Sequence, residues 1–147
     1  NISSISYANV GYTHQGWFTE DQKYFLLGDE TDEQTFGGKT RTIVLDFTDL
    51  DNPTQHFIYN GPTDAIDHNI YVKDNTFYLA NYTAGVRFID LSNIETSSVT
   101  ETGYFDTYPD NDSANFNGAW NLYPFFESKK IVISDINSGL FIIQKTE

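Results

Sequence analysis

Two histidines, His14 and His68, are the residues of this chain whose type and spacing point most directly to chemistry. They stand 54 residues apart, the same step that separates Gly85 from Gly139, and His68 follows directly after Asp67. Imidazole and carboxylate groups together are a common ligand set for divalent metals. The two histidines can share a site only if the chain repeats and the repeats bring equivalent positions together.

A repeated unit does run through the sequence. Residues 80–91 contain a strand end, a tight turn at Gly85 and an alternating strand, and residues 133–143 have the same order. A third copy leads from Leu26–Glu30 through a longer polar insert to Thr42–Phe47. Internal repeats with this period indicate stacked supersecondary units.

Short strands separated by turn-forming residues are predicted throughout the chain. In the three units they are His14–Thr19, Tyr24–Gly28, Thr40–Phe47 and Gln55–Tyr59; Asn69–Lys73, Thr76–Ala80, Val86–Leu91 and Ser97–Phe105; and Ala119–Tyr123, Lys130–Ser134 and Leu140–Gln144. One more strand is predicted at Ile2–Tyr7, and no amphipathic helix is predicted. The first two units therefore have four strands each, and the third has three.

This strand order predicts an all-β fold made of β-propeller blades, which are four-stranded antiparallel sheets of about this repeat length. About three blades are present, at residues 12–60, 66–105 and 116–147, and residues 1–8 are expected to be an outer strand of a neighbouring or closing blade. Propellers normally have at least four blades. The expected partners are therefore the remaining blades of a larger propeller or a second copy of the chain. A β-sandwich of short strands is the alternative fold.

The composition excludes several classes of function. The 147 residues include 21 acidic and 8 basic residues, which gives a formal charge of −13, and they include no cysteine. Such a charge repels a phosphate backbone, so no nucleic acid is expected as a partner. The lack of cysteine excludes thiolate nucleophiles and thiolate zinc sites. No apolar run reaches the roughly 18 residues of a membrane helix, so no membrane span is expected.

The predicted blades place polar residues at equivalent points. The start of the first strand and the end of the second lie at the same end of an antiparallel pair, so these residues are expected to form an arc at one mouth of a central channel. The candidate ligand-binding residues are His14, Asp29, Glu30, Asp67, His68, Asn81, Asn117, Asp135, Trp17 and Trp120. The candidate ligands for a divalent metal, calcium or zinc, are His14, Asp29, His68 and Asp135. In the alternative interpretation, these side chains cap strand ends.

A loop and an acidic run offer further oxygen donors. The loop at residues 106–115 has the ligand type that calcium prefers, with Asp106, Asp110 and Asp112 as candidate calcium ligands, and an ordinary solvated loop is the alternative. The run Asp29–Glu33 is predicted to be an exposed face. The aromatic residues near the same mouth can either stack on sugars or pack between blades. They are Trp17, Tyr82, Tyr108 and Trp120.

Eight sequence blocks carry a further resemblance, namely His14–Trp17, Thr19–Asp21, Leu27–Glu30, Gly61–Thr63, Ile66–Asn69, Ala80–Thr83, Phe105–Pro109 and Phe116–Trp120. Together they resemble the C-terminal half of the choice-of-anchor B family, which are bacterial surface proteins with LVIVD-type propeller repeats. The resemblance runs from about Tyr12 to Ile143 and implies a secreted or surface-tethered bacterial propeller. It implies no particular reaction.

Three functions are open at this point. The preferred one is a non-catalytic secreted or cell-surface propeller that binds a protein, a glycan or a metal through the mouth that carries His14, His68 and Asn117. It is favoured because no nucleophile elbow, phosphate-binding loop or dinucleotide fingerprint is present. The second is a metal-dependent hydrolase that uses the histidine and aspartate arc. The third is a purely structural part of a larger extracellular assembly.

Overall fold

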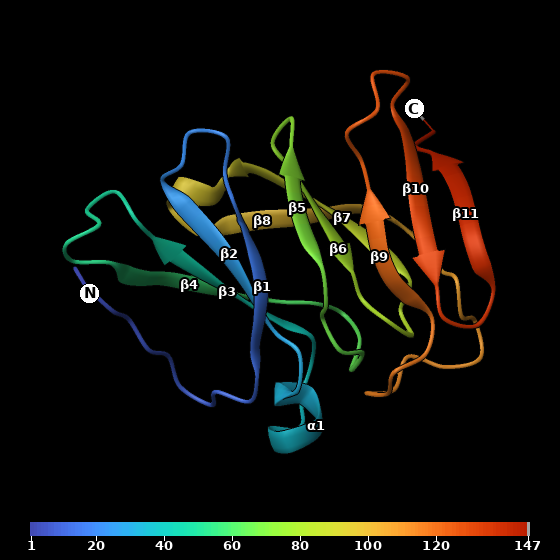
Figure 1. Cartoon of the computed structure of the whole chain (residues 1–147), viewed down its shortest axis with the longest axis horizontal. Helices are drawn as coiled ribbons and strands as arrows, with labels where there is room; N and C mark the ends of the chain where they lie inside the picture. Colours follow the sequence, from blue (N-terminus) through green and yellow to red (C-terminus); the bar gives the residue numbers. More distant parts are fainter. Residues whose placement is uncertain (147) are drawn as a thin grey trace.

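The computed structural model describes residues 1–146, and over these residues it contains eleven β-strands, one α-helix and one 3₁₀ helix. The strands form three antiparallel sheets, each built from strands that are consecutive in the sequence. The three sheets follow one another across the molecule in sequence order (Figure 1). The prediction of an all-β chain built from antiparallel sheets is confirmed. Each strand predicted from His14 onward overlaps an observed strand, with ends that differ by at most two residues.

The first sheet has the order β1-β2-β3-β4. Its strands are β1 (Thr13–Phe18), β2 (Tyr24–Asp29), β3 (Arg41–Asp46) and β4 (Thr54–Asn60). The two central strands are almost entirely buried because both faces of this sheet are covered. On one face Leu26 and Val44 pack against the second sheet, and on the other Leu27 and Ile43 pack against the N-terminal segment.

The second and third sheets repeat this meander. The second has the order β5-β6-β7-β8, with β5 (Ile70–Lys73), β6 (Thr76–Ala80), β7 (Val86–Asn93) and β8 (Ser98–Phe105), and the helix η1 (Ile94–Thr96) lies between its last two strands. The third sheet has β10 (Lys130–Asp135) at its centre, between β9 (Ala119–Tyr123) and β11 (Gly139–Gln144). Strand β1 packs beside β5, and β6 packs beside β9.

Strand β6 shows how the core is divided between the sheets. Because successive side chains of a strand point to opposite faces, Phe77 and Leu79 join the cluster shared with the first sheet. Tyr78 and Ala80 join the cluster shared with the third sheet. The sequence of β6 is therefore a continuous apolar run, which is typical of a strand covered on both sides.

The N-terminal residues differ from the prediction, because residues 1–12 form no strand in the structure. Ile5 and Tyr7 nevertheless alternate as predicted, and they pack against Leu27, Ile43 and Leu45 of the first sheet. The apolar side chains of this segment therefore pack on the sheet, although its backbone does not pair with a strand. The prediction that residues 1–8 complete a neighbouring or closing blade requires that other blade and stays a prediction.

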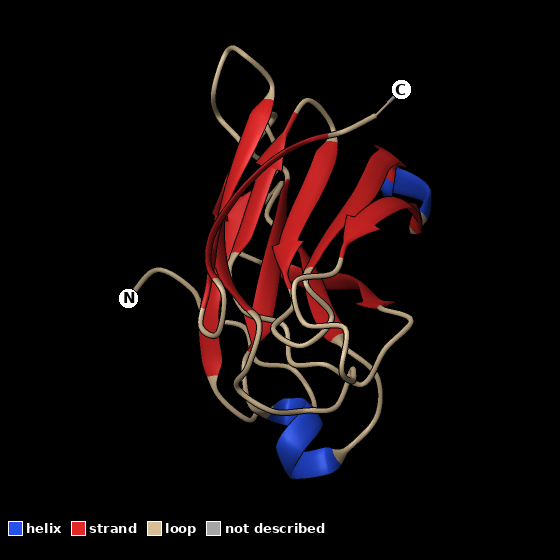
Figure 2. Ribbon diagram, turned by 90° about the vertical axis from the view of Figure 1, so that its right-hand side faces the viewer, coloured by secondary structure: helices blue, strands red, loops and turns tan. Residues whose placement is uncertain are grey.

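A short helix, α1 (Asp32–Phe36), interrupts the polar insert between β2 and β3, where no helix was predicted. Figure 2 shows α1 and many of the connecting loops gathered at one end of the sheets. This is the end where β1, β5 and β9 begin and where β2, β6 and β10 finish, as their antiparallel pairing requires. Residues from all three sheets therefore meet here.

The predicted glycine turn after β6 is confirmed. Gly85 has a φ of 72°, its backbone N–H donates to the carbonyl of Tyr82 at 2.9 Å, and its own carbonyl accepts from the N–H of Asn81 at 2.8 Å. The positive φ favours glycine at this point. The turn sets the direction of β7 and brings Tyr82 to the end of the molecule that carries α1.

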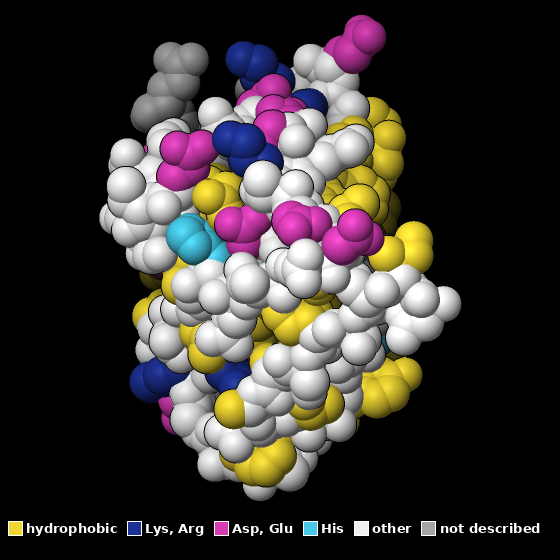
Figure 3. Space-filling model, turned by 90° about the vertical axis from the view of Figure 1, so that its left-hand side faces the viewer, with side chains coloured by type: hydrophobic (Ala, Val, Ile, Leu, Met, Phe, Trp, Pro, Cys, Tyr) yellow, Lys and Arg dark blue, Asp and Glu magenta, His cyan; other side chains and the backbone are white. Residues whose placement is uncertain are grey.

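The surface is acidic, in keeping with the charge of the chain. On the face shown in Figure 3, acidic side chains gather in the upper half, and hydrophobic side chains reach the surface at several separate places. The exposed large hydrophobic residues include Ile2, Leu50, Tyr104, Leu140 and Ile142, each more than half exposed. Among the described residues, no helix has the length and apolar character needed to cross a membrane.

Candidate functional site

The side chains of His14, Glu30 and His68 meet at the end of the molecule that carries α1. His14 Nδ1 lies 3.4 Å from Glu30 Oε2, and His68 Nε2 lies 3.3 Å from Glu30 Oε1. The two imidazole rings are stacked, with centroids 4.5 Å apart and an interplanar angle of 15°. The ligand atoms of the three residues all lie within 4.8 Å of one another. The predicted proximity of the two histidines is therefore present in the structure.

The sequence positions the three side chains through local features of the strands. His14 is the extra residue of a β-bulge, since Thr13 pairs with Asp29 and Gln15 pairs with Gly28. A bulge of this kind redirects a side chain. Glu30 follows β2 immediately, and its backbone N–H donates to the carbonyl of Tyr12 at 3.0 Å.

His68 is fixed before the first residue of β5. Its backbone N–H donates to the carbonyl of Ala80 at 2.9 Å, which extends the pairing of β5 with β6 by two residues. Its side chain is only 2% exposed, compared with 14% for Glu30 and 27% for His14. The site thus has a buried end at His68 and an end open to solvent at His14.

The tautomer of His68 follows from its contact with the third sheet. Its Nδ1 lies 2.6 Å from the carbonyl oxygen of Trp120, which can only accept a hydrogen bond. The short distance between Nδ1 and this acceptor assigns the proton to Nδ1, and the Asn69 amide, 3.0 Å from both Nδ1 and the Trp120 oxygen, then donates to that oxygen. In the neutral ring, Nε2 then has a free lone pair and faces the carboxylate of Glu30. A backbone contact at one ring nitrogen that leaves the other free for a metal is the usual arrangement of ligating histidines.

The electrostatic surroundings keep His68 neutral. Burial lowers the pKa of His68 below its ordinary value, although the Trp120 carbonyl and the Glu30 carboxylate act in the opposite direction. Nε2 is buried and has no hydrogen-bond partner. Two acceptors, Nε2 of His68 and Oε1 of Glu30, therefore face each other, and a cation between them would remove that repulsion.

Aromatic side chains enclose the buried end. The Tyr82 hydroxyl donates to Glu30 Oε1 at 2.7 Å, and the Tyr82 ring lies 4.8 Å from that of His68. Burial and the neighbouring Glu30 raise the pKa of Tyr82 well above its ordinary value, so the hydroxyl stays a donor. The Trp120 ring lies 4.5 Å from that of His68 and 5.9 Å from that of Tyr82, and 47% of Trp120 is exposed.

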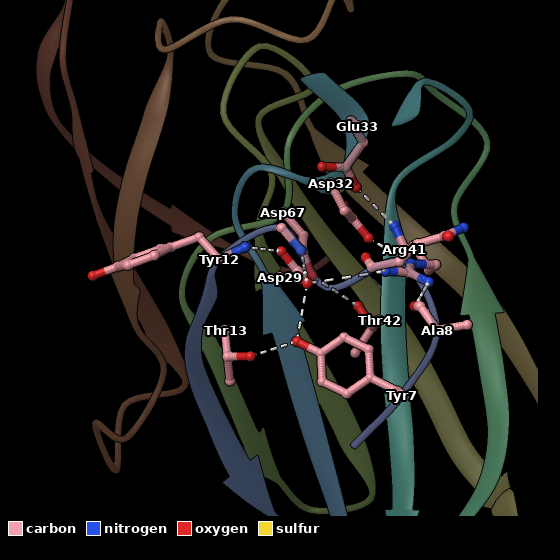
Figure 4. A network of polar contacts seen from close by, with 12 residues as sticks. Tyr7, Ala8, Tyr12, Thr13, Asp29, Asp32, Glu33, Arg41, Thr42 and Asp67 are labelled. Atoms are coloured by element: carbon pink, nitrogen blue, oxygen red, sulfur yellow. Dashed lines mark hydrogen bonds and ion pairs between the residues drawn. The ribbon is translucent and has the colours of Figure 1, made fainter. Parts of the chain in front are cut away.

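Asp29 and Asp67, which were predicted at the same mouth, belong to a separate buried network (Figure 4). The carboxylate of Asp29 is fully buried and accepts hydrogen bonds from the Tyr7 hydroxyl at 2.9 Å, from Gly11 N–H at 2.8 Å and from Tyr12 N–H at 2.5 Å. These bonds hold the N-terminal segment on the first sheet. Asp29 is therefore part of that attachment and does not join His14 and His68.

Asn81 and Asp135 bond backbone groups of their loops, whereas the Asn117 side chain bonds only to the side chains of Asn115 and Asn137 within residues 1–146. Asn81 Nδ2 donates to the carbonyls of Ala65 and Ile66 at 3.1 and 2.8 Å. Asp135 Oδ1 accepts from two N–H groups of the turn after β10, and Asn117 Oδ1 accepts from the side chain of Asn137. These three residues shape loops at the same end of the molecule without joining the histidine pair.

Trp17 and the residues 106–115 lie outside the histidine site. The Trp17 ring packs beside Tyr71, with centroids 5.1 Å apart. Asp106 caps its own loop by accepting from Tyr108 N–H at 2.8 Å. Over residues 1–146, two groups of at least three His, Asp or Glu residues bring their ligand atoms close enough for one ion, and Asp106, Asp110 and Asp112 are in neither.

The second of these groups was not predicted. It consists of Asp32, Glu33 and Asp67, all buried. The acidic run 29–33 was expected to be an exposed face, yet Asp29, Asp32 and Glu33 are each less than 5% exposed. Two features of the sequence could have indicated this group. They are Asp67, the acidic residue directly before His68, and Arg41, the arginine at the start of β3.

The histidine site brings together three side chains, His14, Glu30 and His68, whose ligand atoms lie close enough to hold one metal ion. Imidazole and carboxylate groups suit zinc and similar divalent ions, and the His14 side chain is partly exposed to solvent. Comparisons of the chain with family models, with curated proteins and with solved structures find no match.

Proposed function

We propose that this chain is a segment of a β-propeller that works as a non-catalytic binding module on the bacterial cell surface. The order of strands within each sheet, and the packing of β1 beside β5 and of β6 beside β9, support three consecutive blades. The resemblance to the choice-of-anchor B family supports the surface location. Binding is assigned to the end of the molecule where all three sheets contribute residues.

One observation carries the binding function, namely the convergence of His14, Glu30 and His68 from two sheets. The carbonyl of Trp120, from the third sheet, fixes the tautomer of His68. We infer a site for a divalent transition metal, with zinc as the first candidate, that lets the surface bind a further ligand through the open side at His14. A metal bound by three protein ligands keeps a coordination position for that ligand.

The direct test is a zinc titration of the chelator-treated chain by calorimetry. We expect one Zn²⁺ per chain, and we expect His68→Ala to weaken the affinity by about 100-fold or more, since even the loss of an outer-shell partner costs 10–100-fold. His56→Ala is the matched control, because His56 Nε2 contacts the Ile94 carbonyl far from the site. Equal zinc affinity in His68→Ala and the unchanged chain would refute the site.

The hydrolase is the second candidate, and the open side of the site at His14 favours it. Catalytic zinc sites combine three protein ligands with one bound water, which the metal makes acidic. The zinc-loaded chain can be tested on activated esters such as p-nitrophenyl acetate. Turnover that requires zinc and is lost in His68→Ala would favour the enzyme, and its absence at full zinc occupancy would favour the binding module.

The proposal also predicts a partner for the third sheet. Phe141 and Ile143 of β11 pack inward, whereas Leu140 and Ile142 are 64% and 63% exposed on the opposite side. In a propeller, a further blade would cover them. For the chain alone we expect light scattering to give twice the mass of one chain and Ile142→Lys to give a monomer. A monomer at high concentration without the substitution would contradict closure by a second copy.

A further inference from the structure

Three carboxylates meet in the interior beside Arg41, away from the histidine site. Asp32, Glu33 and Asp67 are 3%, 4% and 0% exposed. The first two lie in α1, and Asp67 lies in the segment before β5, so two distant parts of the chain contribute. Their ligand atoms lie within 4.8 Å of one another. Two oxygens that bind one Ca²⁺ at about 2.4 Å are at most about 4.8 Å apart, and each pair in this group meets that limit.

Each carboxylate has one oxygen held by the protein and one left free. Arg41 Nε donates to Asp32 Oδ2 at 2.5 Å, and the backbone N–H of Arg41 donates to Glu33 Oε1 at 3.0 Å. The Thr42 hydroxyl donates to Asp67 Oδ2 at 3.4 Å. The other oxygens, Oδ1 of Asp32, Oε2 of Glu33 and Oδ1 of Asp67, are buried and have no hydrogen-bond partner. Buried acceptors without partners are costly, so this arrangement favours either a bound cation or a proton shared between carboxyl groups, as between Asp32 and Glu33.

The charge of the network points to a cation. Asp29 lies in the same network, which gives four buried carboxylates (Figure 4). Within residues 1–146, Arg41 is the one basic side chain that forms ion pairs with them, through Asp29 and Asp32. Uncompensated buried charge is strongly unfavourable. A divalent cation would offset two of the excess negative charges, which a single proton cannot do.

Protons can bind to these carboxylates in place of a metal cation. In the absence of a cation, burial raises the pKa of Asp67 and of Asp32 above the ordinary range, and burial and the charge of Asp67 together raise the pKa of Glu33 to about 10. The network would then hold protonated carboxyl groups at neutral pH. Cation binding and protonation are therefore alternatives that a measurement can separate.

We propose that Asp32, Glu33 and Asp67 bind one hard divalent cation, Ca²⁺ in the first instance, which ties α1 and the segment before β5 to the first sheet. The donor set consists of oxygen atoms alone, which suits Ca²⁺ better than a transition metal. The three carboxylates supply one free oxygen each, and water molecules would complete the six to eight oxygen ligands that Ca²⁺ takes. The proposal is independent of the histidine site and of the number of blades.

The test is the thermal melting of the chelator-treated chain with and without CaCl₂ at neutral pH. At a Ca²⁺ concentration about 100 times the dissociation constant, we expect the melting temperature to rise by about 5–10 °C. A parallel calorimetric titration with CaCl₂ should give one ion per chain. No shift and no binding heat at millimolar CaCl₂ would overturn the proposal, and the same shift with MgCl₂ at lower concentration would assign the site to Mg²⁺ instead.

Matched variants locate the effect. Asp67→Asn keeps the shape and removes a charge, so we expect a folded chain that has lost the Ca²⁺-dependent shift, and Glu33→Gln provides the same test should Asp67→Asn fold poorly. Asp112→Asn, in the exposed oxygen-rich loop, and His68→Gln should both keep the shift. A full shift in Asp67→Asn and Glu33→Gln would refute this site. An infrared band of protonated carboxyl groups that persists in saturating CaCl₂ would also refute it.

Discussion

Gly85→Ala is expected to lower the free energy of unfolding by about 2–5 kcal/mol, because two effects add. A left-handed conformation costs a residue with a Cβ about 1–2 kcal/mol, and the φ of Gly85 is 72°. In addition, a Cβ at this position would lie 2.2 Å from the carbonyl oxygen of Phe105 and 2.7 Å from Asp106 Cα. These are backbone atoms of the neighbouring segment, so they cannot move aside as a flexible side chain would, and overpacking of this kind costs about 1–3 kcal/mol.

Gly139 provides the control that separates the two effects. Its φ is 86°, and a Cβ added there would meet no atom within 4 Å. Gly139→Ala should therefore cost only the conformational part, about 1–2 kcal/mol. Urea unfolding of the two variants and of the unchanged chain measures the difference. Equal losses for both variants would show that the close contact of Gly85 with Phe105 does not exist in solution.

Asn81→Ala is expected to cost about 2–4 kcal/mol, although it removes only one small side chain. The Asn81 side chain is fully buried, and its Nδ2 donates to the carbonyls of Ala65 and Ile66 and contacts Thr40 Oγ1 at 3.1 Å. The variant would remove the Asn81 donor from the Ile66 carbonyl and leave the Ala65 carbonyl with the Thr40 hydroxyl, and an unsatisfied buried group costs about 1–3 kcal/mol in addition to the cavity left by the side chain. Because these carbonyls precede Asp67 and His68, the loss should also loosen both candidate cation sites.

The control for Asn81→Ala is Asn111→Ala, because Asn111 is exposed. Within residues 1–146, its side chain forms hydrogen bonds only with Ser113. That variant should change stability by less than about 0.5 kcal/mol. Hydrogen exchange of the amides in residues 64–69 gives the second readout, and it should quicken in Asn81→Ala alone. Unchanged exchange there would mean that other contacts hold the segment.

The strands could be predicted because the apolar and turn residues follow local rules. Thr76–Ala80 is bounded by the turn at Asp74 and Asn75 and by the glycine turn, and the observed β6 has these same ends. The segment Ile2–Tyr7 shows the limit of such rules. Its alternation is real, since Ile5 and Tyr7 face the sheet. Asp29 and Arg41 hold the chain through the Tyr7 hydroxyl and through the backbone of Ala8 and Gly11, which no local pattern reveals.

The candidate site was only half predictable for a similar reason. The repeat placed His14 and His68 at equivalent points, and both reach Glu30. The acidic run after β2 was expected to be exposed, because charged runs usually are. A five-residue helix turns Asp32 and Glu33 inward, toward Arg41 and Asp67. That helix is too short to leave a periodic signal, and the partner residues come from distant parts of the chain.

Tyr82 makes the three sheets interdependent. Its backbone pairs with Ala119 of the third sheet, its ring packs on His68 beside the second sheet, and its hydroxyl reaches Glu30 beside the first. No single sheet therefore contains the complete environment of His68. Partial unfolding of any one sheet should release the contacts of the other two, so the chain should melt in one cooperative transition, and zinc affinity should report the integrity of the whole assembly.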